Sequence, residues 1–134
     1  AVKLEKDIRT PGLPDDTSEG PIYQITRLRL VDESPVAIHI SFVAQKNFPD
    51  IDVDGSSITS IFDYIRNCGY TDFCNENSEI TVSSLNAEER EILNVQGFAP
   101  CLVLTTKCID RTTGKVLETA RTIYRSDKFI FVTH

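Results

Sequence analysis

"IYQITRLRLVDESPVAIHISFVA", residues 22–44, is the stretch that decides the fold. Apolar side chains alternate with others on both sides of the polar segment "DESP", residues 32–35. Alternation with a period of two is typical of a strand that buries one face, and Asp, Ser and Pro favour a turn. The sequence therefore predicts a β-hairpin with strands at 22–31 and 36–44.

A helix is predicted in the segment after this hairpin, "DGSSITSIFDYIRNCG", residues 54–69. Its apolar side chains recur at helical spacing: Ile58, Ile61, Phe62 and Ile65. Ser56 or Ser57 would cap the start of the helix, and Gly69 would close its end.

The remaining elements are short. We expect a loop at 70–77, a strand in "EITVSS" at 79–84, and a short helix capped by Asn86 with Glu89 three residues on. Three antiparallel strands are predicted in the last third, at 99–110, 116–125 and 128–133. The order ββαβαβββ indicates an α+β fold, with helices packed against a mainly antiparallel six-stranded sheet.

Length and composition indicate one domain. The chain has 134 residues, of which 40% are hydrophobic, enough for one core. Residues 1–20 are rich in Pro, Gly and Asp and are predicted to be a linker or arm, so the folded domain would span 21–134. The chain begins without Met, and we expect it to be a fragment of a longer polypeptide.

Charge and hydropathy exclude two classes of partner. The net charge of −6 opposes nonspecific attraction to nucleic acid phosphates, so this segment is not expected to bind DNA by itself. Its apolar runs are much shorter than the roughly 20 residues that cross a bilayer. A soluble, cytosolic protein without membrane contact is predicted.

The cysteines do not indicate a metal site. Cys68, Cys74, Cys101 and Cys108 lack CxxC spacing, and the sequence predicts no metal and no cofactor. Cys101 and Cys108 would lie about 23 Å apart on one strand and point to opposite faces, so they cannot pair. Reduced, buried thiols are predicted, with a Cys68–Cys74 bridge as the alternative.

Two arginines share one face of the predicted hairpin. Alternation puts Arg27 and Arg29 together, and a register that aligns odd with odd residues places His39 and Ser41 beside them. Like charges repel, so an anion between the guanidinium groups would explain the pattern, since arginine binds carboxylate or phosphate through two parallel hydrogen bonds. Alternatively both arginines point into water, the common outcome for a solvated sheet face.

Three further residues are candidates for an anion site. Ser60 is expected in the first turn of the helix, where free N–H groups favour an anion, although serines there are ordinary capping residues. Glu118 and Tyr124 share one face of their strand because six residues separate them. Glu118 could accept hydroxyl protons and Tyr124 could donate to an anion. Alternatively, Glu118 pairs with a nearby Lys or Arg, and Tyr124 packs.

Four segments carry a resemblance to a known family: "ITRLRLVDESPVAIHISFV", "SSITSIFDYIRNCGY", "LNVQGFAPCLVLTTKCID" and "GKVLETARTIYRSDKFIFV". In this order they resemble the UTRA domain, the effector-sensing half of HutC-type regulators in the GntR family, from residue 22 to 132. The resemblance implies a chorismate lyase-like α+β fold, a small-metabolite effector and a homodimer. It also implies that DNA is bound only through a winged helix-turn-helix domain absent from this chain, and that the chain is not an enzyme.

The resemblance also implies roles for the candidate residues. In members that sense phosphorylated sugars, an R-x-R pair grips the phosphate, which matches Arg27 and Arg29, and a serine matching Ser60 assists. A Glu and a Tyr spaced by six hold the ligand, which matches Glu118 and Tyr124. No catalytic residue is implied.

His39 departs from the family pattern. The family commonly has a Glu at that place, in contact with the end of the ligand away from the anion. An imidazole can donate or accept there according to its tautomer, so the effector could differ from an amino sugar. An ordinary strand histidine is the alternative.

Two other functions remain open at this point. A chorismate lyase-like enzyme could act on a small carboxylic acid by positioning arginines around it, which requires no nucleophile. A dimerisation module with a degenerate pocket is the other alternative, and the departure at His39 favours it.

Overall fold

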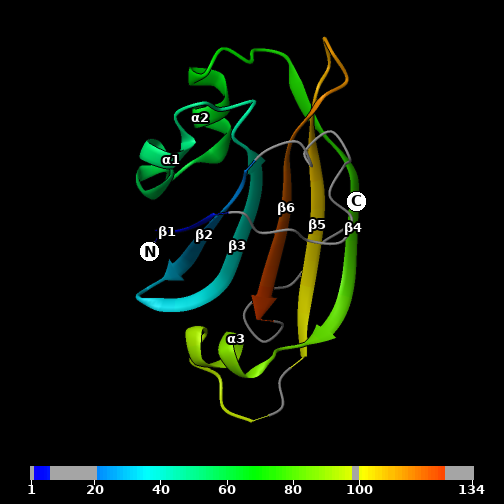
Figure 1. Ribbon diagram of the computed structural model, residues 1–134. Helices are drawn as coiled ribbons and strands as arrows, with labels where there is room; N and C mark the ends of the chain where they lie inside the picture. The colour runs from blue at the N-terminus through cyan, green and yellow to red at the C-terminus, as the bar shows by residue number, and fades with distance from the viewer. Residues whose placement is uncertain (1, 7–20, 98–99, 126–134) are drawn as a thin grey trace.

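The computed structural model describes residues 2–6, 21–97 and 100–125, and their strands form one antiparallel sheet (Figure 1). The strands lie in the order β1-β2-β3-β6-β5-β4. They are β1 Val2–Lys6, β2 Ile22–Val31, β3 Ser34–Ala44, β4 Phe73–Ser84, β5 Pro100–Asp110 and β6 Val116–Arg125. The predicted α+β class with a mainly antiparallel six-stranded sheet is confirmed.

The first strand was not predicted. Residues 2–6 fall in the expected linker, yet they pair with β2 so that Val2 lies opposite Arg27 and Lys6 opposite Tyr23. The short "VKLEK" alternation is a strand signal that the Pro- and Gly-containing residues after it obscured. The rest of the expected linker, 7–20, and the strand predicted at 128–133 lie outside the described residues.

The hairpin forms as predicted, with a tighter turn. Asp32 and Glu33 both have positive φ, 49° and 66°, as the two central residues of a type I′ turn do. The turn therefore occupies two residues, and β3 begins at Ser34 instead of residue 36. The register aligns odd with odd residues, as predicted: Arg27 lies opposite His39.

The segment predicted as one helix, 54–69, contains two separate pieces, the 3-10 turn η2 Gly55–Ser57 and α2 Ile61–Asn67, and a short helix not predicted from the sequence, α1 Ile51–Asp54, precedes them. The prediction that Ser56 or Ser57 caps the main helix was wrong. Ile58 has extended backbone angles (φ −73°, ψ 123°) and buries its side chain, which ends η2 and lets Ser60 cap α2. The end was predicted correctly, because Gly69 adopts φ 105° directly after the C-cap.

The segment after α2 forms strand earlier than predicted. β4 begins at Phe73, opposite Asp110 of β5, so the loop predicted at 70–77 was wrong over residues 73–77. A register shift between Glu76 and Glu79 interrupts the alternation there, which hid the strand from the sequence pattern.

The short third helix is confirmed as α3, Ala87–Ile92. The Asn86 side chain accepts from the Glu89 amide at 2.8 Å, and the Glu89 carboxylate accepts from the Asn86 amide at 2.9 Å. This reciprocal capping box satisfies two backbone donors that the helix leaves free.

Helices cover opposite faces of the sheet at opposite ends. Figure 1 shows α1 and α2 near one end of the strands and α3 near the other. The core under α1 and α2 contains Tyr23, Ile25, Val43, Phe48, Ile51, Ile58, Ile61, Ile65, Cys108 and Leu117. The core under α3 contains Ile38, Leu85, Leu93, Cys101, Val103 and Ile123. α2 covers only one end of this face of the sheet. Polar residues in the middle of the strands therefore lie next to the helix and are not covered by it.

All four cysteines are free thiols. Cys101 and Cys108 are buried, as predicted, but Cys68 is exposed because it is the C-cap of α2, and Cys74 is partly exposed. Within the described part of the chain, no helix is long and apolar enough to span a membrane.

Candidate functional site

A row of side chains crosses the sheet on the face that α2 partly covers. Arg27 of β2 lies opposite His39 of β3, His39 opposite Thr122 of β6, and Thr122 opposite Leu104 of β5. Directly opposed residues of antiparallel strands point to the same side. Two residues further along each strand, Ser41, Ala120 and Thr106 form a second such row.

A cavity of about 320 Å³ lies over these two rows, closed on one side by the start of α2. Its lining residues are Arg27, His39, Ser41, Thr59, Ser60, Ile61, Phe62, Asn75, Leu104, Thr106, Glu118, Ala120 and Thr122. This volume is near the lower end of the range of small-molecule sites. The cavity therefore suits a compact polar ligand.

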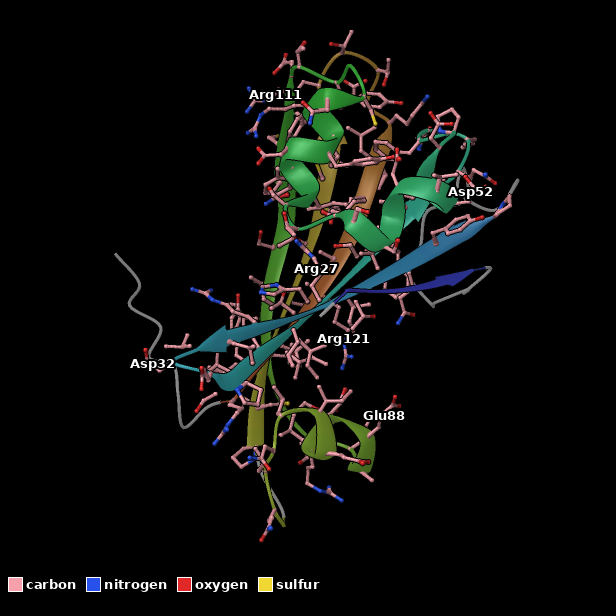
Figure 2. All side chains as sticks on the ribbon, turned by 90° about the vertical axis from the view of Figure 1, so that its left-hand side faces the viewer. Arg27, Asp32, Asp52, Glu88, Arg111 and Arg121 are labelled. Atoms are coloured by element: carbon pink, nitrogen blue, oxygen red, sulfur yellow. The ribbon has the colours of Figure 1, made fainter. Side chains whose placement is uncertain are left out.

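The guanidinium of Arg27 connects the sheet to the segment before α2. Its Nη1 donates to the Thr59 carbonyl oxygen at 3.1 Å and its Nη2 donates to the Ser41 hydroxyl at 3.4 Å. Its Nε is buried and has no hydrogen-bond partner among the described residues. Figure 2 shows Arg27 near α2, whereas Arg121 lies toward α3.

Glu118 is the most buried ionisable group in the cavity. Only 2% of it is exposed, and its Oε2 has no hydrogen-bond partner among the described residues. Burial raises the pKa of Glu118, while Ser41 and the charge of Arg27 act in the opposite direction. A buried carboxyl oxygen without a partner is costly, so a ligand group that donates a hydrogen bond to Oε2 would be favoured.

His39 is held in one orientation at the middle of the row. Its Nδ1 lies 3.2 Å from the Thr122 hydroxyl, and its ring meets that of Tyr124 edge-on, with centroids 6.2 Å apart. Burial lowers the pKa of His39, and the positive charges of Arg27 and Arg29 lower it further. The neutral imidazole is therefore favoured, with Nε2 left for a ligand.

The structure brings together four of the six predicted site residues: Arg27, His39, Ser60 and Glu118 line the cavity. Arg29 follows Arg27 on the same face but is exposed and is not among the lining residues. Tyr124 contacts His39 from outside the lining.

Ser60 differs in role from the prediction. It precedes α2 instead of lying in its first turn, and its hydroxyl accepts from the Asp63 amide at 3.4 Å. Because α2 has only seven residues, the expected contribution of a long helix to anion binding is not available here.

Sequence reasoning missed five polar lining residues: Ser41, Thr59, Asn75, Thr106 and Thr122. Alternation had placed Ser41 on the correct face, and the same rule applied to residues 118–124 included Thr122. Asn75 and Thr106 could not be found in this way, because their position depends on β6 lying between β3 and β5.

A second cavity, of about 310 Å³, lies between η2 and α2. Asp54 and Asp63 are among its lining residues, and the Tyr64 hydroxyl donates to Asp54 Oδ2 at 2.8 Å. Carboxylates repel anions, so this cavity does not suit the anionic ligand that the arginines indicate.

Comparison with protein families and curated proteins identifies relatives among transcriptional regulators. A family model described as the UTRA domain matches residues 16–130. The HTH-type transcriptional repressor NagR of Bacillus subtilis (strain 168) is 31% identical over 115 residues, which cover 83% of this chain and 45% of NagR. The chain thus spans less than half the length of this relative.

Solved structures share the fold at low sequence identity. The C-terminal domain of Yurk from Bacillus subtilis superposes with a TM-score of 0.86 at 13% identity, covering 99% of this chain and 94% of that one. The effector domain of PhnF from Mycobacterium smegmatis gives 0.81 at 19%, covering 98% and 83%. The effector binding domain of the trehalose repressor TreR of B. subtilis gives 0.77 at 20%, covering 99% and 94%.

Proposed function

Because the chain belongs to the UTRA domain family, we propose that it is the effector-sensing and dimerisation domain of a GntR/HutC-type transcriptional regulator. Its effector would be a small anionic metabolite, with a sugar phosphate or a related phosphorylated or carboxylated compound as the preferred class. The observation that carries this proposal is the cavity in which Arg27 Nε and Glu118 Oε2 are both buried without partners among the described residues.

Arg27 and Glu118, which both interact with Ser41, suit two kinds of ligand group. Arg27 would bind the anion, since a guanidinium donates to phosphate or carboxylate through charge-assisted hydrogen bonds. Glu118 would meet a hydroxyl or amide donor of the same ligand. Ser60 and His39 line the space between these groups and α2, and Arg29 and Tyr124 would support the anion and the imidazole from just outside.

Signal transmission would begin at β2. Arg27 is tied to Thr59 before α2, and it pairs through its backbone with Val2 of β1. A ligand that accepts hydrogen bonds from the guanidinium would therefore affect both the segment before α2 and β1, the first strand of this chain. A coupling of about 1–3 kcal/mol would change operator affinity about 5- to 150-fold.

The remaining parts of the proposal concern the full-length protein. We propose that a winged helix-turn-helix domain outside this chain binds DNA, that the regulator is a cytoplasmic homodimer, and that binding proceeds without turnover. The relative NagR is a repressor, which supports regulation in place of catalysis.

Calorimetric titration tests the site directly. Glucose 6-phosphate, glucosamine 6-phosphate, gluconate and inorganic phosphate are titrated into the domain, and at least one phosphorylated compound is expected to bind. Unchanged binding in Arg27→Gln would place the anion elsewhere. A thermal melt that does not move with any of these compounds would contradict the proposal, since a ligand at 100 times its Kd stabilises by about 2.7 kcal/mol.

A further inference from the structure

We propose that His39 takes up a proton when a phosphoryl group binds beside Arg27, so that the site prefers a dianionic phosphate to a singly charged carboxylate. The inference rests on the proposed anion site and names the ligand class that this site would select. It assigns to His39 a part in specificity that depends on its charge.

The geometry puts the imidazole beside Arg27, whereas the family pattern has this place in contact with the end of the ligand away from the anion. Arg27 and His39 are directly opposed across β2 and β3, and both line the cavity. Directly opposed Cβ atoms are about 4.5–5.5 Å apart, so one phosphoryl group can reach both side chains. Because Nδ1 is engaged by the Thr122 hydroxyl, Nε2 is the ring nitrogen that would meet a phosphoryl oxygen.

The charged groups around His39 oppose its protonation in the free domain. From β2, Arg27 and Arg29 face it with positive charge; from β6, Thr122 and the phenol of Tyr124 are neutral neighbours. The start of α2 contributes the uncharged Ser60 and Phe62 to the same cavity. The remaining ionisable group there is Glu118.

A bound dianion would reverse this balance. Two negative charges next to Arg27 favour the imidazolium, which then donates Nε2–H to the phosphoryl oxygen while Nδ1–H donates to Thr122 Oγ1. The proton comes from solvent, and no covalent bond changes. A carboxylate supplies one negative charge, which Arg27 alone neutralises, so it draws a proton to His39 much more weakly.

Glu118 needs separate consideration, because the same anion would also favour its protonated form. A measured proton uptake could therefore belong to either group. The protonation state of the imidazole itself has to be observed, and the chain makes this practicable because it contains two histidines, His39 and His134.

The experiment is NMR of the uniformly 15N-labelled chain, which reports backbone amides and histidine ring nitrogens together, in wild type and in His134→Gln, which leaves His39 as the single imidazole. Ring nitrogen shifts are followed from pH 5 to 8.5, free and with saturating glucose 6-phosphate, inorganic phosphate or gluconate. We expect both phosphates to raise the pKa of His39 by about 1–3 units, the range for an opposite charge within hydrogen-bonding reach. Gluconate is expected to leave it nearly unchanged.

Affinity gives a second readout. Above pH 7 a phosphate monoester is already a dianion, since its second pKa is about 6. If binding takes up a proton, glucose 6-phosphate binding weakens as the pH rises. The loss is up to about tenfold per pH unit between the free and bound pKa values of His39. His39→Gln, which keeps a polar side chain without titrating, should remove most of this dependence.

The outcomes separate the two proposals. If the phosphates shift the cavity amides while His39 stays neutral, the proton uptake is wrong and the anion site stands. If gluconate raises the pKa of His39 as much as phosphate does, the preference for a dianion is wrong. If none of the three compounds shifts any cavity amide, the anion site itself fails and the inference with it.

Discussion

Arg27 on β2 donates a 3.1 Å hydrogen bond to the carbonyl oxygen of Thr59, the residue before the N-cap of α2. This bond joins the middle of β2 to the segment before α2, 32 positions further along the chain. An anion bound by the guanidinium would compete with the Thr59 carbonyl, so occupancy of the cavity is expected to change how firmly α2 is held.

Replacing Arg27 tests the main anion contact. Arg27→Gln is expected to weaken binding of a phosphorylated ligand by about tenfold to 150-fold, equivalent to the 1.5–3 kcal/mol of a hydrogen bond to a charged group. Calorimetric titration measures the change. Arg111→Gln is the matched control, because Arg111 is an exposed arginine in the turn between β5 and β6 that pairs with Asp72. Equal losses in the two variants would indicate a general charge effect.

Hydrogen exchange tests the link between Arg27 and α2. Ligand binding is expected to change protection of the amides at the start of α2, including that of Tyr64, which bonds to the Ser60 carbonyl. α3 is an internal control, since it packs on the opposite face of the sheet. A uniform change in both helices would show global stabilisation and argue against a local response.

Two serines distinguish the observed helix start from the predicted one. Ser60→Ala removes the cap of α2 and is expected to lower the free energy of unfolding by about 1 kcal/mol. Ser56→Ala, at the position where the sequence predicted the cap, should change it by less than about 0.5 kcal/mol, because Ser56 is exposed. Urea unfolding measures both free energies. A larger loss in Ser56→Ala than in Ser60→Ala would support the longer helix that the sequence predicted.

Glu118 should make stability depend on pH. Its folded pKa is raised by burial, so its contribution to stability is fully present below the unfolded value, about 4.3, and is lost as pH rises through the folded pKa. Glu118→Gln is therefore expected to gain stability relative to wild type as pH increases from 4 to 8. The gain is about 1.4 kcal/mol for each unit by which the pKa is raised.

Urea unfolding at a series of pH values measures this gain. Glu79→Gln serves as the control because Glu79 is an exposed carboxyl on β4. If Glu118→Gln and wild type keep a constant difference across the pH series, the carboxyl is not held in a desolvated site.

Thiol labelling tests the burial of the cores. Cys68 and Cys74 are expected to react with a maleimide in the folded protein, whereas Cys101 and Cys108 should react only in urea. Burial raises the pKa of Cys108 to about 12 and also raises that of Cys101, which suppresses the reactive thiolate. Mass spectrometry counts the labels, and rapid modification of Cys101 without urea would show that the core under α3 opens readily.

The sequence by itself determined the hairpin, the face that Arg27 and His39 share, and the start of α3. Each is a local property, because period-two alternation fixes which side chains share a face and a capping box needs only four consecutive residues. The sequence did not predict the break between η2 and α2. Ile58 continues the helical spacing, and only the core it enters shows that its backbone is extended.

The cavity was decided by the tertiary structure. β6 inserts between β3 and β5, which brings Glu118 and Thr122 beside His39 and adds Thr106 and Asn75 from strands that alternation cannot order. The same arrangement buries Glu118 without a hydrogen-bond partner for Oε2 among the described residues and leaves Arg29 exposed outside the lining. Pairing between distant strands depends on how whole faces of the sheet pack. The sequence pattern shows which side chains of a strand share a face, but it does not show which strand lies next to it.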